Sequence, residues 1–135
     1  MKLLSKKAAR VAAVGGVVLA AMGSTVAYAG TSSTELSNGR LSFEAFNGRE
    51  RSLPASKFYS ATQYKKTGGG TVTVVFGMTT EKILVKSPAK TVKNGQTVGH
   101  SWGGRSVSDT GDCSATGFMK SDGSTYYTPP VNGLC

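Results

Sequence analysis

Thr71-Val72-Thr73-Val74-Val75-Phe76 is the stretch that decides the fold class of this chain of 135 residues. In an extended backbone Val72, Val74 and Phe76 face one way, and Val75 faces the other. β-branched and aromatic residues favour strands, and apolar side chains on both faces indicate a strand that is covered on both sides. The stretch therefore predicts a strand in the centre of a sheet.

Every asparagine of the chain is followed by glycine, and the pairs are Asn38-Gly39, Asn47-Gly48, Asn94-Gly95 and Asn132-Gly133. Asn-Gly suits type I′ turns, in which both central residues need positive φ. Residues 40–46 alternate apolar and polar positions before the second pair, and short strand-like runs at 91–93 and 96–98 flank the third. We predict a hairpin at each of these two pairs.

Further strands are predicted at 57–64, 82–86, 105–108, 115–120 and 124–128, with a flexible loop at 65–70 and a turn at Asp122-Gly123. No segment after residue 29 shows sustained helical spacing. Short strands separated by turn residues are typical of all-β domains, so we predict a single small antiparallel β-sandwich or barrel over 38–135. The segment 30–37, which is polar and rich in threonine and serine, is predicted to be a disordered N-terminus of the mature chain.

Residues 1–29 have the pattern of a cleaved N-terminal signal helix. A basic stretch precedes an apolar run at 11–22, and Ala27-Tyr28-Ala29 has the small-x-small pattern that signal peptidase reads. We predict cleavage between Ala29 and Gly30. The alternative is a retained membrane anchor over 8–29, but the apolar run is shorter than the roughly 20 residues of a spanning helix. The mature chain is thus expected to be secreted, with no integral membrane segment, and to act in the medium or at the cell surface.

Removal of the signal peptide lowers the net charge from +9 to +5, with twelve basic and seven acidic residues remaining. Nucleic-acid-binding proteins usually carry a concentrated basic stripe with aromatic residues between the charges. The nearest run is interrupted by Pro88 and alternates with apolar residues; it comprises Lys82, Lys86, Lys90 and Lys93. Such a run fits solvated strand faces and protected strand edges, or attraction to an anionic cell wall or membrane. We expect no nucleic-acid partner.

The two cysteines, Cys113 and Cys135, both lie in the part of the chain that is expected to be exported. In an oxidising compartment they should form a disulfide that closes the C-terminal segment onto the domain. In the chain-entropy description a loop of this size stabilises the fold by about 3 kcal/mol. His100 is the one histidine and no Cys/His ligand spacing is present, so neither a metal site nor another cofactor is expected.

Gly99-His100-Ser101-Trp102-Gly103 matches the G-x-S-x-G nucleophile elbow of α/β-hydrolases. That motif needs a strand-to-helix turn at the serine and a histidine from later in the chain as its base. Neither a helix pattern nor a histidine follows Ser101. The carboxylates that could act as acid and base show no fixed catalytic spacing; they are Glu44, Glu50, Asp109 and Asp112. Asp109-Thr110-Gly111 resembles the aspartic-protease motif, which one short domain could use only as a dimer. We therefore expect no enzymatic activity.

Aromatic residues are the remaining candidates for a binding surface, since rigid exposed rings suit contacts with proteins and sugars. These candidates are Tyr59, Tyr64, Trp102, Tyr126 and Tyr127. Neighbouring residues of a strand point to opposite faces, so one of the last two is expected to face outward. The alternative for each ring is ordinary packing in the core or at a strand edge.

From Phe58 to Cys113, an aromatic strand, the valine-rich strand at 71–76, a second strand and a glycine-rich stretch follow one another. This order resembles the small secreted α-amylase inhibitors of the tendamistat type. The resemblance implies a β-sandwich that plugs an enzyme cleft with a Trp-Arg-Tyr turn. The corresponding place here holds Ala61-Thr62-Gln63-Tyr64, without the tryptophan and the arginine, and the family's paired disulfides are absent. We do not assign the chain to this family on these features.

The leading hypothesis is a secreted, non-enzymatic β-rich binding protein that contacts an extracellular protein or a cell-wall polymer. Inhibition of a secreted hydrolase is one form of it. The rival hypothesis is a basic antibacterial or cell-surface protein that is held by charge. Ionic strength distinguishes them, because release from cells at moderate salt indicates charge-driven binding and salt-insensitive capture indicates specific recognition.

Overall fold

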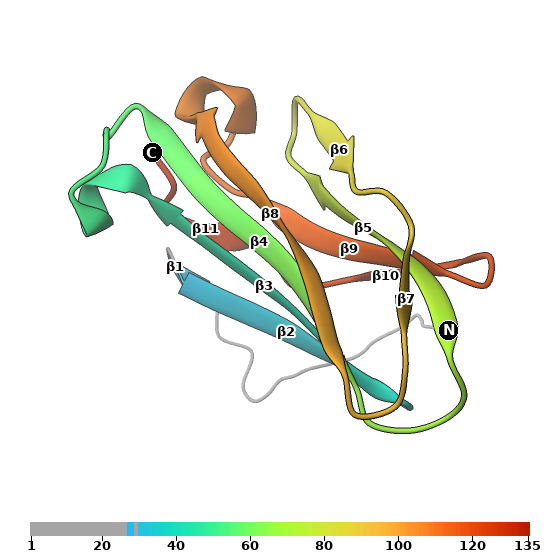
Figure 1. Ribbon diagram of the computed structural model, residues 1–135. Coiled ribbons are helices and arrows are strands. Elements are labelled where there is room, and N and C mark those ends of the chain that lie inside the picture. Colours follow the sequence, from blue (N-terminus) through green and yellow to red (C-terminus); the bar gives the residue numbers. More distant parts are fainter. Residues whose placement is uncertain (1–26, 29) are drawn as a thin grey trace.

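Two antiparallel sheets packed face to face make up most of the computed structural model (Figure 1), which describes residues 27–28 and 30–135. The first sheet has the order β2-β3-β4-β8 and consists of β2 (Gly30–Leu36), β3 (Gly39–Asn47), β4 (Lys57–Lys66) and β8 (Thr97–Ser106). The second has the order β10-β9-β5-β6, with β7 also on β5; it consists of β5 (Val72–Thr79), β6 (Leu84–Lys86), β7 (Lys90–Val92), β9 (Thr116–Ser121) and β10 (Ser124–Tyr127). The predicted antiparallel all-β fold is thereby confirmed.

Shorter elements flank the two sheets. β1 (Ala27–Tyr28) pairs in parallel with β11 (Val131–Asn132), and two short 3-10 helices, η2 (Gly48–Arg51) and η3 (Val107–Thr110), follow β3 and β8. The predicted signal peptide lies outside the described residues except for β1, and so does Ala29 at the expected cleavage site. Among the described residues, no helix has the length and apolar content needed to cross a membrane.

β5 is the central strand of the second sheet, as the valine-rich stretch predicts. It pairs with β9 on one side, and with β7 and then β6 on the other. Val74, Phe76 and Met78 of β5 are fully buried and pack in one core with Leu41 and Phe43 of the first sheet. The hydrophobic core therefore lies between the two sheets.

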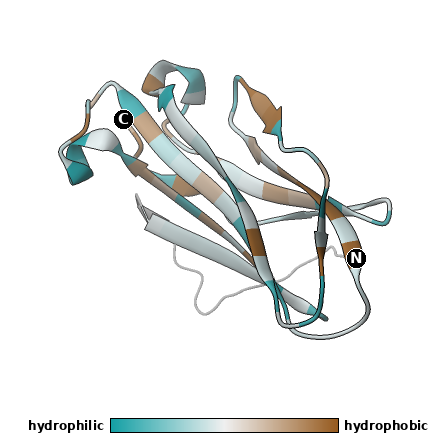
Figure 2. Cartoon of the chain, in the orientation of Figure 1, coloured by the Kyte–Doolittle hydropathy of each residue, from teal (hydrophilic) through white to brown (hydrophobic). Residues whose placement is uncertain are grey.

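The structure corrects the prediction of a disordered segment at 30–37. Gly30–Leu36 forms β2, which pairs with β3 along its whole length. β2 is pale in Figure 2, because it has almost no hydrophobic residues and hence no apolar alternation. Its hydroxyl groups reach β10 and the segment that follows it instead: Thr34 Oγ1 donates to the Tyr127 carbonyl and Ser32 Oγ to the Pro129 carbonyl, each at 2.7 Å. The polar side chains that suggested disorder thus hold the strand in place.

The hairpin predicted at Asn94-Gly95 is wrong. The chain does turn there, with the Gln96 amide donating to the Lys93 carbonyl at 3.0 Å. However, β7 pairs with β5 in the second sheet and β8 pairs with β4 in the first. The turn therefore carries the chain from one sheet to the other.

The other predicted turns differ in outcome. β3 and β4 pair as a hairpin, but Asn47 caps η2 through its side chain and the connection runs over 48–56, so no two-residue turn forms at Asn47-Gly48. The turn at Asp122-Gly123 joins β9 to β10 and has φ of 51° and 78° at its two residues, as predicted. The strands predicted at 57–64, 115–120 and 124–128 correspond to β4, β9 and β10, whereas 105–108 divides between the end of β8 and η3.

The predicted disulfide joins Cys113 and Cys135, whose Cα atoms lie 5.2 Å apart. Beside it, the Leu134 amide donates to the Cys113 carbonyl at 2.9 Å, and the Leu134 carbonyl accepts from Asn47 Nδ2 at 2.8 Å. Leu134 itself is fully buried. The bridge thus holds the C-terminus at the end of the sandwich that lies opposite the turn between β2 and β3.

One polar side chain connects the two sheets through the core. Thr62 of β4 is fully buried, and its Oγ1 donates to the carbonyl of Gly77 in β5 at 2.9 Å. The same oxygen accepts the indole N–H of Trp102 in β8 at 3.0 Å. A shift in the β4–β8 register next to Trp102, with Gly103 at φ 68°, marks a β-bulge. Three strands from two sheets therefore meet at one hydroxyl group.

We expect Thr62→Val to lower the free energy of unfolding by about 1–3 kcal/mol, because it leaves the buried Trp102 indole N–H without an acceptor at unchanged volume. Thr91→Val is the matched control, since Thr91 is an exposed strand residue, and its effect should stay within about 0.5 kcal/mol. Urea denaturation monitored by tryptophan fluorescence measures both. Equal stability of the two variants would contradict the role given to Thr62.

Candidate functional site

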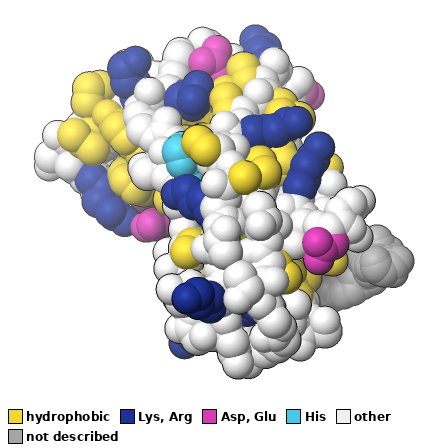
Figure 3. Space-filling view, turned by 45° about the vertical axis from the view of Figure 1, so that its right-hand side comes forward, with side chains coloured by type: hydrophobic (Ala, Val, Ile, Leu, Met, Phe, Trp, Pro, Cys, Tyr) yellow, Lys and Arg dark blue, Asp and Glu magenta, His cyan; other side chains and the backbone are white. Residues whose placement is uncertain are grey.

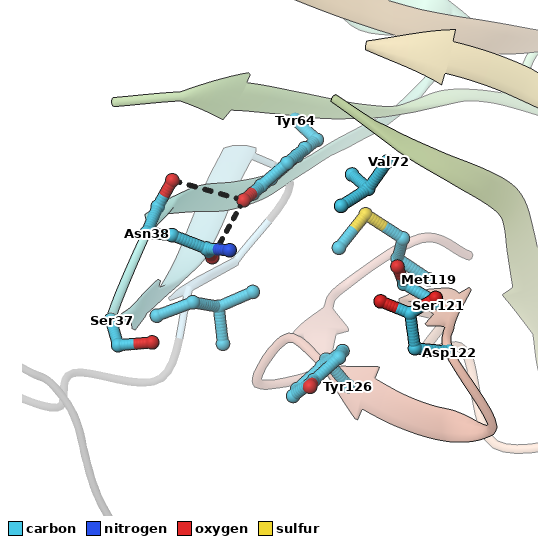
Figure 4. Close-up of a pocket in the computed structure, with 9 residues that line it drawn as sticks. Ser37, Asn38, Tyr64, Val72, Met119, Ser121, Asp122 and Tyr126 are labelled. Atoms are coloured by element: carbon cyan, nitrogen blue, oxygen red, sulfur yellow. Dashed lines mark hydrogen bonds between the residues drawn. The ribbon is translucent and has the colours of Figure 1, made fainter. Parts of the chain in front are cut away.

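A pocket of about 130 Å³ opens at the end of the sandwich between the β2–β3 turn and the β9–β10 hairpin. Figure 4 shows Ser37 and Asn38 on one side of it and Ser121, Asp122 and Tyr126 on the other. The remaining lining residues are Leu36, Tyr64, Val72 and Met119. The site is therefore built by both sheets, from segments far apart in the sequence.

The pocket has an apolar floor and a polar rim. Tyr64 and Met119 in the floor are 1% and 2% exposed, and Leu36 and Val72 pack against the same core. The rim consists of hydroxyl, amide and carboxylate groups from Ser37, Asn38, Ser121, Asp122 and Tyr126. This division is typical of binding sites, in which apolar contact supplies affinity and a few polar groups fix orientation.

Tyr64 links the floor to the rim. Its hydroxyl lies 2.8 Å from Asn38 Oδ1 and 3.1 Å from the Asn38 carbonyl oxygen, to which it donates (Figure 4). Burial, and to a lesser extent the neighbouring phenol of Tyr126, raises the pKa of Tyr64 above its ordinary value. The phenol is thus a neutral donor near pH 7 and holds the β2–β3 turn in place.

The rim keeps polar groups free for a ligand. Ser121 Oγ is directed to the Thr73 carbonyl at 3.4 Å. Within residues 30–135, by contrast, the side chains of Ser37, Asp122 and Tyr126 form no hydrogen bond or ion pair with one another or with a neighbour. Asp122 stands at φ 51° in the tight turn with Gly123, so its carboxylate is presented at the tip of the hairpin. Together these groups offer one negative charge and two hydroxyls to an incoming group.

The pocket unites two of the five aromatic residues that the sequence analysis singled out, Tyr64 and Tyr126. Trp102 is only 7% exposed, and its indole is bound to Thr62, so it is a core residue. Tyr59 lies on the outer face of the first sheet, where its ring is 5.7 Å from that of Phe46. Trp102 and Tyr59 therefore do not belong to the pocket, and neither does Tyr127.

Tyr127 faces outward from the second sheet and is 56% exposed, while its neighbour Tyr126 packs against the core. This confirms that adjacent tyrosines of the strand point to opposite faces. Tyr127 lies beside Phe118, with ring centroids 5.7 Å apart. Phe118 in turn lies over Gly77, where a Cβ atom would come within 2.0 Å of its ring. Tyr127 thus extends an aromatic row on the outer face, away from the pocket.

The candidate catalytic motifs do not adopt the geometries that their chemistry needs. Ser101 lies within β8, where it pairs with Ala61, so 99–103 is extended and forms no strand-to-helix elbow. Glu44 pairs with Arg51 at 3.2 Å, and Glu50 accepts from the Asn47 amide at 3.2 Å. In the part of the chain that the structure describes, no group of three or more His, Cys, Asp or Glu residues could hold a metal ion.

The segment that resembles the amylase-inhibitor turn is also extended here. Ala61-Thr62-Gln63-Tyr64 lies within β4, and both Thr62 and Tyr64 are buried. An exposed inhibitory turn at this place is therefore absent from the described structure. Comparison of the chain with models of known protein families, with curated proteins and with solved structures finds no match.

Sequence reasoning missed four residues of the rim, namely Ser37, Asn38, Ser121 and Asp122. It used Asn38-Gly39 and Asp122-Gly123 only as turn signals. Turn residues often carry function because a rigid scaffold positions them at the surface. The polar side chains of the two turns were therefore the available signal, but their meeting at one end depends on the pairing of the strands.

The stability of the fold should fall as the pH rises above about 10. In the unfolded chain Tyr64 ionises near that value, whereas the folded chain holds its proton to higher pH, so the unfolded state gains stability in this range. We expect Tyr64→Phe to flatten the decline in the free energy of unfolding between pH 9 and pH 12, whatever its effect at neutral pH. Tyr127→Phe is the control and should keep the wild-type slope. Identical slopes for all three proteins would contradict a raised pKa of the buried Tyr64 phenol.

Proposed function

We propose that this chain is a secreted, non-catalytic binding protein that holds a small protruding group of an extracellular protein or cell-wall polymer in the end pocket. The observation that carries the proposal is the free polar rim above an apolar floor, where Asp122 and Tyr126 have no partner among the described residues.

The size of the pocket sets the kind of group that it can hold. About 130 Å³ is well below the 300–1,000 Å³ of sites that enclose a whole drug-sized ligand. The pocket suits a single side chain or a single sugar unit, with the rest of the partner lying across the two turns. Specificity would then come from Asp122 and the hydroxyls of the rim.

The rigidity of the pocket supports a binding role. Tyr64 ties the β2–β3 turn to β4, and Ser121 of β9 contacts the neighbouring strand β5. A site that is ordered before its partner arrives loses little conformational entropy on binding. Inhibition of a secreted hydrolase is one form of this function, in which the partner is an enzyme and the two turns contact the rim of its cleft.

Export is supported by two features of different kinds. Residues 1–29 have the signal-peptide pattern, and the disulfide between Cys113 and Cys135 is of a type that persists in oxidising compartments. A binding protein in such a compartment would meet its partner outside the cell.

The test is capture of a partner by residues 30–135 from culture supernatant and from solubilised cell wall. Asp122→Asn/Tyr126→Phe removes the free charge and hydroxyl of the rim with almost no change of shape. We expect it to weaken binding of the captured component at least about tenfold, as the loss of one charge-assisted hydrogen bond requires.

Asp109→Asn/Tyr127→Phe is the matched control, since it makes the same chemical changes outside the pocket. It should bind like the wild type. Full affinity of the pocket variant, or capture of no component from either fraction, would contradict the proposal.

A further inference from the structure

One side of the sandwich is basic over a long continuous part of the chain. From Lys82 to Ser108 there is no acidic residue. This part comprises β6, β7 and β8, which lie on the same side of the two sheets, where β8 ends the first and β6 and β7 end the second. We call its cationic residues the basic edge; they are Lys82, Lys86, Lys90, Lys93 and Arg105.

The charges of the basic edge are not neutralised by the protein. Among the described residues the ion pairs are Arg40–Glu35 and Arg51–Glu44, and neither involves this part of the chain. Lys82, Lys86 and Lys93 are exposed. In Figure 3 the face that carries the single histidine, His100 of β8, shows more dark blue Lys and Arg side chains than magenta Asp and Glu side chains.

The lysines are arranged along a line. β7 and β6 pair in succession with the same side of β5, so 82–93 follows one edge of the second sheet with an interruption around Pro88. Lys90 Nζ donates to the carbonyl of Gly99, which holds β7 against β8.

Protection of a strand edge does not account for this pattern. An edge strand needs only an occasional charge or proline to resist pairing with another chain, and Pro88 already interrupts this one. Lys82 precedes β6 and Lys93 follows β7, so two of the four lysines lie outside the strands that would need protection.

We propose that the basic edge binds a linear polymer that carries phosphate groups. Lysine ammonium groups bind phosphate as point charges and need no fixed orientation of the ligand, and several exposed lysines without an ion-pair partner along one edge suit repeated negative charges along a flexible chain. No residue of the basic edge lines the end pocket, so this inference is independent of the proposed function.

The experiment measures the affinity of residues 30–135 for long-chain inorganic polyphosphate between 50 and 300 mM salt. Lys82→Gln/Lys86→Gln/Lys93→Gln removes the exposed charges of the basic edge and leaves Lys90 in its contact with β8. Lys57→Gln/Lys65→Gln/Lys120→Gln is the matched control, since it removes three exposed lysine charges from β4 and β9. Lys82→Arg/Lys86→Arg/Lys93→Arg keeps the charges.

We expect the basic-edge variant to bind about tenfold more weakly and with a shallower dependence on salt, because fewer counterions are released. The control and the arginine variant should stay within about threefold of the wild type. If both charge-removing variants weakened binding equally, the net charge of the protein alone would explain the binding, and the proposal would be overturned. Absence of polyphosphate binding would also overturn the proposal. If the protein bound anionic phosphatidylglycerol vesicles but not polyphosphate, the ligand of the basic edge would be a membrane surface instead of a polymer.

Discussion

The hydroxyl group of Thr62 is the contact on which the arrangement of the two sheets depends. The core between the sheets is apolar, and burial of apolar surface is non-directional, so packing alone tolerates small shifts of one sheet over the other. The bonds from Thr62 to the Gly77 carbonyl and from the Trp102 indole to Thr62 are directional and join β4, β5 and β8. Both surfaces to which we give a role need this register. The end pocket places Tyr64 of the first sheet beside Met119 of the second, and the basic edge places β8 beside β7.

The sequence predicts the parts of the fold that depend on local chemistry. The valine-rich stretch at 71–76 indicates its own central position, and Asp122-Gly123 has the residues that a tight turn demands. Asn94-Gly95 shows what local chemistry cannot predict, because a turn needs the same residues whether it joins two strands of one sheet or crosses between sheets. The choice is made by the pairing of β7 with β5 and of β8 with β4. β2 illustrates the same limit, since the carbonyls that its Ser32 and Thr34 hydroxyl groups bond lie more than ninety residues away.

The candidate site could be predicted only in part. Tyr64 and Tyr126 are recognisable as candidates, but their approach depends on the stacking of two sheets and is not encoded near either residue. For Trp102 the sequence pattern predicts a binding residue, but the structure shows a core residue. Its glycine-rich surroundings suggest an exposed loop, whereas the bulge in β8 turns the ring into the core. Glycine also permits close approaches that cannot be recognised from the sequence, as at Gly117, where a Cβ atom would lie 2.6 Å from the ring of Phe43.

The protein is a rigid two-sheet scaffold with a pocket at one end and a line of positive charge along one side. Its rigidity requires that the link through Thr62 stays closed in solution, and exchange of the Trp102 indole proton measures this. Trp102 is the one tryptophan, so its indole proton gives a single signal in a proton spectrum recorded in D2O. We predict that this proton exchanges as slowly as the most protected amides of β4 and β5, through global unfolding. Loss of the indole signal within minutes, while those amides persist, would show that the link through Thr62 opens without unfolding of the sheets and would contradict its role.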